Sequence, residues 1–324
     1  MRQKKLGKSE LNVSVLCFGA NVFGWTVRDE KLSFKLLDRC LEAGLNFIDT
    51  ADMYSTWVPG NQGGESETLI GKWFKDRKNR AQVILATKVG MEMGPGKSGL
   101  RKSYIMKAID ASLLRLKTDY VDLYQSHKDD ETTSVEETLT AYADLVKQGK
   151  VRVIGASNYT PERLSESLKV SAEFQLPRYE SLQPLYNLLE REEFETQLAP
   201  LCAKENIGVI GYFSLASGFL SGKYKRKEDM AQSDRGSRVE KYMNERGFRI
   251  IDALEKVAKA TDSTPSAVAL AWLMAQPTVT SPIASATNEK QLDELIAATK
   301  LVLDKTALAI LNEASDYAET NARK

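Results

Sequence analysis

Tyr120-Val-Asp-Leu-Tyr-Gln-Ser-His127 is a strand-like run that ends in the only histidine of this 324-residue chain. Two comparable apolar runs lie upstream: Asn46-Phe-Ile-Asp49 ends in a carboxylate, and Val83-Ile-Leu-Ala-Thr-Lys88 ends in an amine. The intervals from 49 to 88 and from 88 to 127 are both 39 residues. This regular spacing indicates a repeated unit that places a polar side chain at the same point of each repeat.

Short apolar runs of this kind alternate with longer segments of helical periodicity along the whole chain. Most runs are continuously apolar, as expected for parallel strands that are buried on both faces. Eight strand–helix units predict an α/β fold, a (β/α)₈ TIM barrel formed as a single domain over residues 1–324. The predicted strands are residues 13–18, 46–51, 83–89, 120–126, 151–157, 181–186, 208–215 and 280–286.

Several local signals predict how the units begin and end. Thr160 and Thr264 each precede a proline, which is typical of a capping hydroxyl before the first turn of a helix. Thr133 is followed three residues later by Glu136, the spacing of a capping box. The residues before position 13, with a turn at Gly7-Lys8, predict a hairpin that closes the barrel floor. Residues 223–245 are polar and charged, and predict a long loop over the barrel mouth.

Composition excludes several classes of function. The 45 basic and 44 acidic residues give a net charge of +1, so no general attraction to nucleic acid or to an anionic membrane is expected. No apolar stretch is long enough to span a bilayer, and the N-terminus lacks the pattern of a signal peptide. The three cysteines show no metal-ligand spacing, and one histidine cannot supply a histidine-rich metal site. A cytoplasmic protein without a metal is predicted.

The carboxyl ends of barrel strands form the active-site face, so Asp49, Lys88 and His127 are expected to meet there. Tyr54 follows five residues after Asp49 and completes a candidate catalytic group. We expect Asp49 to keep Lys88 charged and Lys88 to lower the pKa of Tyr54, so that the phenol serves as a general acid. His127 would donate a second hydrogen bond to the substrate oxygen.

Later strand ends carry groups suited to a large cofactor with a flat head and phosphates. Ser157, Asn158 and Gln183 offer amide and hydroxyl groups for a planar carboxamide, and Tyr212 offers an aromatic face. Loops after the last two strands are a recurrent phosphate site in barrels. The polar or small residues of these loops include Ser214, Ser217, Lys223, Ser285, Thr287 and Gln291. A Rossmann fingerprint is absent, because Gly19 and Gly24 have no second glycine between them.

These pieces together resemble the aldo-keto reductase superfamily over nearly the whole chain. The resemblance implies a TIM barrel, NADPH-dependent reduction of a small-molecule carbonyl, and a catalytic tetrad of Asp49, Tyr54, Lys88 and His127. The motifs that carry it are Leu16-Cys-Phe-Gly19, Gly44-Leu-Asn-Phe-Ile-Asp-Thr-Ala-Asp-Met-Tyr54, Gly64-Glu-Ser-Glu-Thr-Leu-Ile-Gly71, Ala86-Thr-Lys-Val89, Asp119-Tyr-Val-Asp-Leu-Tyr-Gln-Ser-His127, Gly155-Ala-Ser-Asn158 and Leu220-Ser-Gly-Lys-Tyr224.

The resemblance also implies a set of NADP(H)-binding residues. Arg235 falls where the potassium-channel β-subunit branch places a mouth-loop arginine on the adenosine phosphate. Thr287 stands where many members carry arginine, so the choice of NADP over NAD rests on Lys223 and Arg235. The implied set is Gly19, Asn21, Ser157, Asn158, Gln183, Tyr212, Phe213, Ser214, Leu215, Ser217, Lys223, Arg235, Ser285, Thr287, Gln291 and Glu294.

Trp25 and Trp57 are predicted to form substrate walls beside this site, or else to anchor their loops. Two other functions stay open. The first is a non-catalytic NADP(H) sensor, since the channel β-subunits share the architecture. The second is a Schiff-base aldolase that uses Lys88. The sequence specifies neither the physiological carbonyl nor an oligomeric state.

Overall fold

The computed structural model describes residues 1–232 and 236–317 of the chain. Eight strands form one sheet in which every neighbouring pair is parallel, in the order β10-β3-β4-β5-β6-β7-β8-β9. The strands are β3 (Cys17–Gly19), β4 (Phe47–Asp49), β5 (Ile84–Val89), β6 (Val121–Ser126), β7 (Val151–Ser157), β8 (Tyr179–Gln183), β9 (Gly208–Val209) and β10 (Ile283–Ala284).

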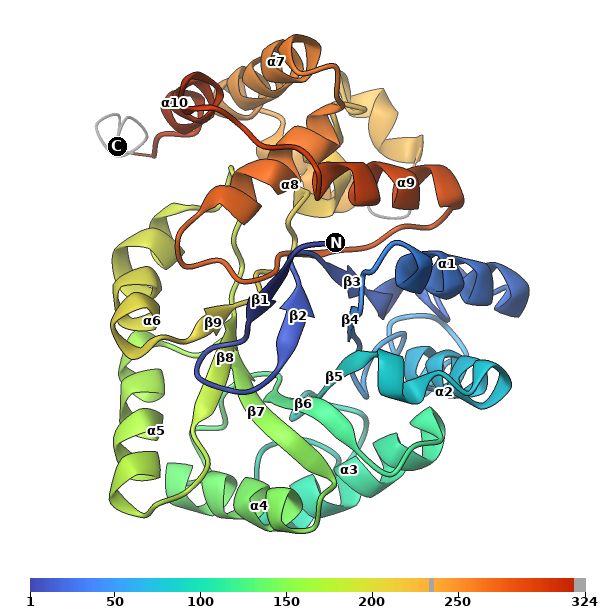
Figure 1. Cartoon of the computed structure of the whole chain (residues 1–324), viewed down its shortest axis with the longest axis vertical. Coiled ribbons are helices and arrows are strands. Elements are labelled where there is room, and N and C mark those ends of the chain that lie inside the picture. Colours follow the sequence, from blue (N-terminus) through green and yellow to red (C-terminus); the bar gives the residue numbers. More distant parts are fainter. Residues whose placement is uncertain (233–235, 318–324) are drawn as a thin grey trace.

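Backbone hydrogen bonds join the two ends of this sheet. The N–H of Thr280 donates to the carbonyl of Val209 at 2.8 Å, and the N–H of Ile283 donates to that of Gly211 at 2.9 Å. The sheet is therefore a barrel, with helices around it (Figure 1), and the predicted (β/α)₈ fold is confirmed. The helices are α1 (Glu30–Glu42), α2 (Glu65–Arg77), α3 (Lys102–Leu116), α4 (Val135–Lys147), α5 (Pro161–Glu173), α6 (Ala199–Glu205), α7 (Glu245–Ala260), α8 (Pro265–Ala275), α9 (Glu289–Ala298) and α10 (Lys305–Ala314).

A hairpin of β1 (Gln3–Lys5) and β2 (Asn12–Ser14) closes the barrel floor, as predicted. Leu6, Leu11 and Val13 are buried and pack on apolar side chains inside the barrel, such as Phe47. Figure 1 shows the hairpin in front of the strands. The prediction of one strand over residues 13–18 is wrong, because residues 13 and 14 pair with β1 and the barrel strand begins only at residue 17.

The segment over the mouth differs from the predicted long loop. Its described residues include two short helices, η5 (Lys227–Gln232) and η6 (Gly236–Tyr242), and a third, η4 (Ala216–Ser221), directly precedes it. Val239 and Tyr242 of η6 are buried, and the ring of Tyr242 lies 5.8 Å from that of Phe219 in η4. These apolar contacts explain why a segment of polar composition folds into helical turns against the barrel.

Of the three predicted helix caps, the structure confirms two, and the third is wrong. The hydroxyls of Thr160 and Thr264 accept hydrogen bonds from backbone N–H groups three residues later, both at 3.2 Å. Thr133 does not cap α4, because Ser134 accepts the bond from the Glu137 N–H at 3.2 Å. The hydroxyl of Thr133 instead donates to a carboxylate oxygen of Asp130 at 2.7 Å. A carboxylate is a stronger acceptor than a neutral group, so this bond is preferred over a cap on α4.

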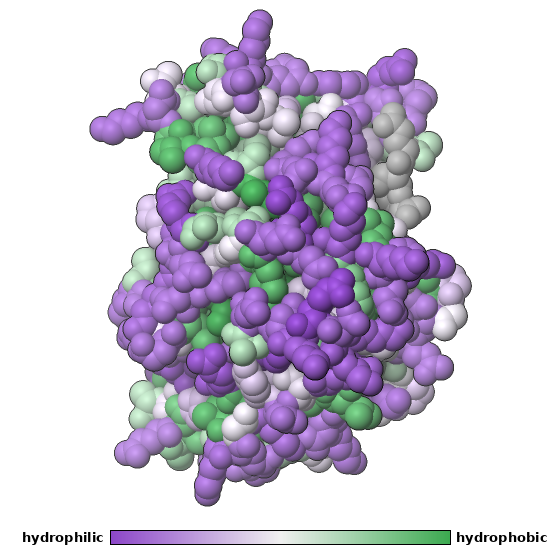
Figure 2. Space-filling model, turned by 45° about the vertical axis from the view of Figure 1, so that its right-hand side comes forward, coloured by the Kyte–Doolittle hydropathy of each residue, from purple (hydrophilic) through white to green (hydrophobic). Residues whose placement is uncertain are grey.

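The outer surface is largely polar on the face drawn in Figure 2, where hydrophobic residues appear in small groups between hydrophilic ones. Among the described residues, no helix combines the length and the apolar character that crossing a membrane requires.

Candidate active site

Side-chain alternation along the strands explains how polar groups reach the barrel mouth. Side chains two residues apart on a strand point to the same side. Phe47, Ala86 and Leu123 belong to the apolar cluster inside the barrel. Two residues after Phe47 and Ala86 come Asp49 and Lys88, which therefore point inward one layer closer to the mouth.

Lys88 is the centre of the resulting group. Its ammonium donates to Asp49 Oδ2 at 2.6 Å, to the Thr50 carbonyl at 2.8 Å and to the Tyr54 hydroxyl oxygen at 2.7 Å. The side chains of Lys88 and Asp49 are 0% and 1% exposed. Because both charges are withdrawn from water, their attraction is screened far less than that of a surface pair. The amine, the carboxylate and the phenol thus form one connected group.

The pKa of Tyr54 is raised well above its usual value by burial and by the negative charge of Asp49. The Tyr54 hydroxyl also donates to Asp49 Oδ2 at 3.3 Å, which favours the protonated phenol. The net shift of this pKa is therefore upward, because burial and Asp49 outweigh the lowering predicted from Lys88. A raised pKa keeps the phenol protonated at neutral pH, and a proton donor requires that state.

His127 lies beside this group, with its ring centroid 6.0 Å from that of Tyr54. Its backbone N–H donates to the carbonyl of Val89 at 2.8 Å, which extends the pairing of β5 and β6 past the last strand residue. Burial and the charge of Lys88 hold the pKa of His127 well below its usual value. The imidazole is therefore neutral, and its buried Nδ1 has no hydrogen-bond partner in the described chain.

Two glutamines hold the second oxygen of Asp49. Gln125 Nε2 and Gln183 Nε2 donate to Asp49 Oδ1 at 3.1 and 3.0 Å. Gln183 was predicted to hold a carboxamide, whereas the structure directs its amide N–H toward Asp49. Sequence reasoning missed Gln125, although it stands two residues after inward-pointing Leu123 and so had to point inward as well. Both amides fix the carboxylate that Lys88 and Tyr54 share.

The other groups predicted for the carboxamide lie together at the ends of β7 and β9. Asn158 Nδ2 donates to the His127 carbonyl at 2.9 Å, and Asn158 Oδ1 accepts from the Tyr212 hydroxyl at 2.8 Å. The Ser157 hydroxyl donates to the Gln183 carbonyl at 2.8 Å. Asn158 has a φ of 55°, a left-handed conformation that asparagine tolerates. Asn158 thereby connects the histidine strand to the aromatic ring of Tyr212.

The loop predicted for phosphates has an unusual backbone. Phe213, Ser217 and Gly218 have φ values of 54°, 59° and 93°. Successive turns of this kind direct backbone N–H groups into a concave surface that suits an anion. The Lys223 ammonium lies close to Gly218 and 4.9 Å from the ring centroid of Tyr224. The loop therefore combines backbone donors with one cation.

The remaining predicted cofactor residues lie at the end of β3, directly after it, and in the segment that follows β10. The Ser285 hydroxyl donates to Asn21 Oδ1 at 2.9 Å. Gly19 has no room for a side chain, because a Cβ there would lie 2.7 Å from Ser285 Oγ. The N–H and hydroxyl of Thr287 both donate to Gln291 Oε1, at 2.8 and 3.0 Å. These bonds order the turn that leads into α9.

One cavity of about 1170 Å³ connects these regions. It is larger than the roughly 300–1,000 Å³ of pockets for drug-sized ligands. Lys88 is buried behind it, Trp25 does not line it, and the predicted Arg235 lies outside the described residues. The predicted residues that line the cavity are Gly19, Asn21, Asp49, Tyr54, Trp57, His127, Ser157, Asn158, Gln183, Tyr212, Phe213, Ser214, Leu215, Ser217, Lys223, Ser285, Thr287, Gln291 and Glu294.

Several cavity-lining residues were not predicted. They include Thr26, Met91, Arg238 and Lys290. Thr26 and Met91 stand in loops after β3 and β5, and loops at the carboxyl ends of strands build barrel sites, so position alone could have indicated them. Arg238 falls in the segment predicted to lie over the mouth, but the sequence does not show which side chains of that segment reach the cavity.

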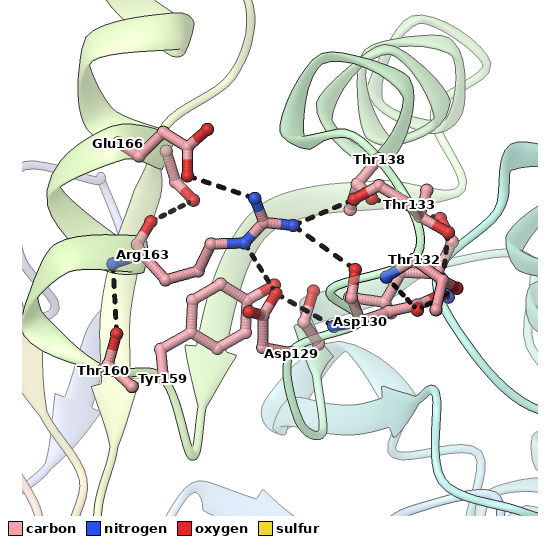
Figure 3. A network of polar contacts seen from close by, with 12 residues as sticks. Asp129, Asp130, Thr132, Thr133, Thr138, Tyr159, Thr160, Arg163 and Glu166 are labelled. Carbon is pink, nitrogen blue, oxygen red and sulfur yellow. Dashed lines mark hydrogen bonds and ion pairs between the residues drawn. The ribbon is translucent and has the colours of Figure 1, made fainter.

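The segment after His127 is held in place by Arg163 of α5. Figure 3 shows the guanidinium between α5 and this segment. It donates to Asp129 Oδ1 at 2.9 Å and to the carbonyls of Asp130 and Thr133 at 3.3 and 2.9 Å. These bonds tie the chain that follows the histidine to the neighbouring helix, and so restrict movement of the imidazole.

Asp52 is a buried carboxyl group in the loop between β4 and Tyr54. It is 1% exposed, and neither side-chain oxygen has a hydrogen-bond partner in the described chain. Burial and the charge of Glu67 raise the pKa of Asp52 to about 8. Asp52 is therefore protonated at neutral pH.

We expect this proton to make stability depend on pH. Between about pH 4 and pH 8 the folded chain keeps the proton, whereas the unfolded chain has lost it. The free energy of unfolding should therefore fall as pH rises through this window, by at most about 1.4 kcal/mol per pH unit. The Asp52→Asn variant lacks this titrating group. The stability of the variant relative to wild type should therefore be greater at pH 8 than at pH 5.

Urea unfolding at the two pH values measures this difference. Asp252→Asn, which changes an exposed carboxylate on α7, is the control. An Asp52→Asn effect of equal size at pH 5 and pH 8 would show that Asp52 is ionised in the folded chain.

Comparison with known proteins agrees with this geometry. The model of the aldo/keto reductase family matches residues 15–316. The chain belongs to the aldo/keto reductase family. The match spans the strands β3 to β10 and the helices that surround them, so it covers the whole barrel but not the floor hairpin.

Individual relatives within the aldo/keto reductase family carry different names. An "uncharacterized oxidoreductase YrpG" of Bacillus subtilis is 35% identical, over 97% of this chain and 95% of its own. A "probable voltage-gated potassium channel subunit beta" of Arabidopsis thaliana is 32% identical, over 94% and 95%. An "aldo-keto reductase yakc [NADP(+)]" of Schizosaccharomyces pombe is 32% identical, over 90% and 84%. Both catalytic and channel-associated names thus occur at similar identity.

Proposed function

We propose that this aldo/keto reductase reduces an aldehyde or ketone to an alcohol with NADPH, and that Tyr54 is the general acid. The observation that carries the proposal is the position of the Lys88 ammonium. It lies 2.6 Å from Asp49 Oδ2 and 2.7 Å from the hydroxyl oxygen of Tyr54. The phenol lines the same cavity as His127, so a carbonyl oxygen bound there would meet two hydrogen-bond donors.

When bound, the dihydronicotinamide would supply the hydride to the carbonyl carbon. Tyr54 would donate its proton to the carbonyl oxygen, and the phenolate left behind would be stabilised by Lys88. The raised pKa of Tyr54 keeps that proton in place until the oxygen becomes basic. His127, kept neutral by its lowered pKa, would hold the carbonyl oxygen by a hydrogen bond without adding a positive charge.

The residues of the cavity fit a phosphate-bearing dinucleotide. Asn158 and Ser157 would hold the carboxamide, Tyr212 would stack on the ring, and Lys223 with the backbone of residues 213–218 would bind the pyrophosphate. The preference for NADP is supported by Lys223, and a relative of similar sequence carries NADP(+) in its name. Arg235 is proposed to bind the adenosine phosphate. We also propose that the protein acts in the cytoplasm.

A cofactor sensor without turnover is the second candidate, because one relative is named as a potassium channel subunit. Such a protein would need the cofactor residues but not the acid. The contacts of Lys88 with both Asp49 and Tyr54 favour an enzyme, since a sensor has no use for a phenol held on a buried ammonium.

A Schiff-base aldolase is disfavoured by the surroundings of Lys88. A nucleophilic lysine must be reached by the substrate as a neutral amine. Here the side chain is fully buried, and three acceptors surround its nitrogen.

Two measurements test the proposal. Titration with NADPH and NADH, followed by fluorescence, should give tighter binding of NADPH. Screening of aldehydes, ketones and sugars should then reveal steady NADPH oxidation at 340 nm for some of them. Binding of NADPH with no oxidation by any carbonyl would favour the sensor. Borohydride trapping of a substrate on Lys88 without any nicotinamide would contradict both the reductase and the sensor.

A further inference from the structure

A row of aromatic rings leads from the catalytic phenol to a cation at the cavity mouth. The ring centroid of Tyr54 lies 6.1 Å from that of Trp57, and the Trp57 ring lies 5.6 Å from that of Trp25. The guanidinium carbon of Arg238 lies 5.5 Å from the centroid of the Trp25 ring. Arg238 lines the same cavity as Tyr54 and Trp57. Three successive contacts therefore connect the phenol to the arginine, which belongs to the helix η6.

Arg238, like Lys223 and Arg226 of the mouth segment, has no ion pair with a carboxylate among the described residues, whereas the other described cations of this segment do. Lys227 pairs with Glu240 at 3.4 Å, and Lys241 pairs with Glu190 at 2.7 Å. The exposed guanidinium of Arg238 contacts the face of the Trp25 ring. A contact with an aromatic face orients a guanidinium but does not neutralise its charge.

The charged groups nearest the Tyr54 phenol do not neutralise the positive charge of Arg238. Asp49 and Lys88 neutralise each other at 2.6 Å, and His127 is neutral because its pKa is lowered. The other cations among the described residues that line the cavity are Lys223 and Lys290, which lie in the segments assigned to the cofactor, so Arg238 is the lining cation left for a substrate. A guanidinium whose face is occupied still presents its N–H groups along the edge, where they fit the two oxygens of a carboxylate or phosphate.

We propose that Arg238 binds the anionic group of a carbonyl substrate that carries a carboxylate or phosphate at the end away from its carbonyl. This inference rests on the proposed function, since it assigns the substrate class of the same site. The carbonyl would lie at Tyr54 and His127, the body of the substrate along Trp57, and the anion on Arg238. Trp25 would act as a positioning residue, because it holds the guanidinium in place.

The test compares matched charged and neutral aldehydes. 4-Carboxybenzaldehyde is compared with 4-carbamoylbenzaldehyde, and glyceraldehyde 3-phosphate with glyceraldehyde. In the wild type, kcat/KM should be higher for the anion of at least one pair. Arg238→Gln should lower the ratio of anionic to neutral kcat/KM in that pair by about 10- to 100-fold, the effect expected for a charge-assisted hydrogen bond. The two pairs distinguish carboxylate from phosphate recognition.

Arg226→Gln is the matched control. It removes the same charge from an exposed position of the mouth segment that does not line the cavity, so the ratio should not change. A ratio that falls equally in both variants would show long-range attraction rather than binding at Arg238. A ratio unchanged in Arg238→Gln would overturn the proposal.

Two further outcomes separate this inference from the proposed function. If Arg238→Gln weakens the binding of NADPH but not that of NADH, Arg238 contacts the cofactor phosphate and the inference is wrong. If the wild type reduces neutral aldehydes with no preference for anions, carbonyl reduction stands and the substrate class is wrong. If no aldehyde is reduced at all, the proposed function fails first.

Discussion

Replacement of Tyr54 by phenylalanine is expected to lower kcat by about 10²- to 10⁴-fold, the usual contribution of a general acid. The ring would still fill the same space beside Trp57, and Lys88 would still be paired with Asp49. Only the transferable proton would be lost. The Kd for NADPH, measured by fluorescence titration, should therefore change little while NADPH oxidation nearly stops.

Tyr120→Phe provides the control, because it removes a phenol next to the opposite end of β6. It should leave kcat and the Kd for NADPH unchanged. If Tyr54→Phe kept wild-type turnover, the proton would have to come from another group and the proposed mechanism would be wrong. A large rise in the Kd for NADPH would instead mean that the phenol supports cofactor binding.

Lys88→Met is expected to have the largest effect on stability as well as to abolish reduction. The variant leaves the Asp49 carboxylate buried without its cation. Breaking a buried ion pair in this way costs about 3–5 kcal/mol. Urea unfolding should show a loss of that size. Lys5→Met, which breaks an exposed pair with Glu10, should cause little change.

The double variant Asp49→Asn/Lys88→Met separates the two effects. It removes both buried charges, while an amide at position 49 can still accept bonds from Gln125 and Gln183 through its oxygen. Most of the lost stability should return, whereas NADPH oxidation should stay at the level of Lys88→Met. Full stability in the single variant would mean that Asp49 takes up a proton or that water reaches it.

The positions of Asp49, Lys88 and His127 could be predicted because continuous apolar runs define parallel strands, and the ends of such strands meet at one face. Tyr54 could be assigned to the same site because it follows Asp49 by only a few residues in the sequence. The direction of the Tyr54 pKa shift could not be predicted, since it depends on how much of the ring is buried and on which oxygen of Asp49 the hydroxyl faces.

Other features depend on contacts between segments that are distant in the chain. Thr133 fitted a capping box, but Asp130 offered its hydroxyl a charged acceptor and Ser134 became the cap. Arg238 looked like one more charge in a polar loop until η6 was placed against the barrel. The alternation of residues 121–126 would have indicated Gln125, because its side chain had to point the same way as Leu123.

The floor hairpin has a consequence for how the chain folds as it is made. Lys4 donates to the carbonyl of Val279 at 2.7 Å, 275 residues further along the chain. At synthesis rates of about 5–20 residues per second, tens of seconds pass before that partner leaves the ribosome. Until then Leu6, Leu11 and Val13 have no completed barrel to fill, and the nascent chain exposes them. We therefore expect the floor hairpin to need protection by chaperones from early in translation until the last barrel strand has been made.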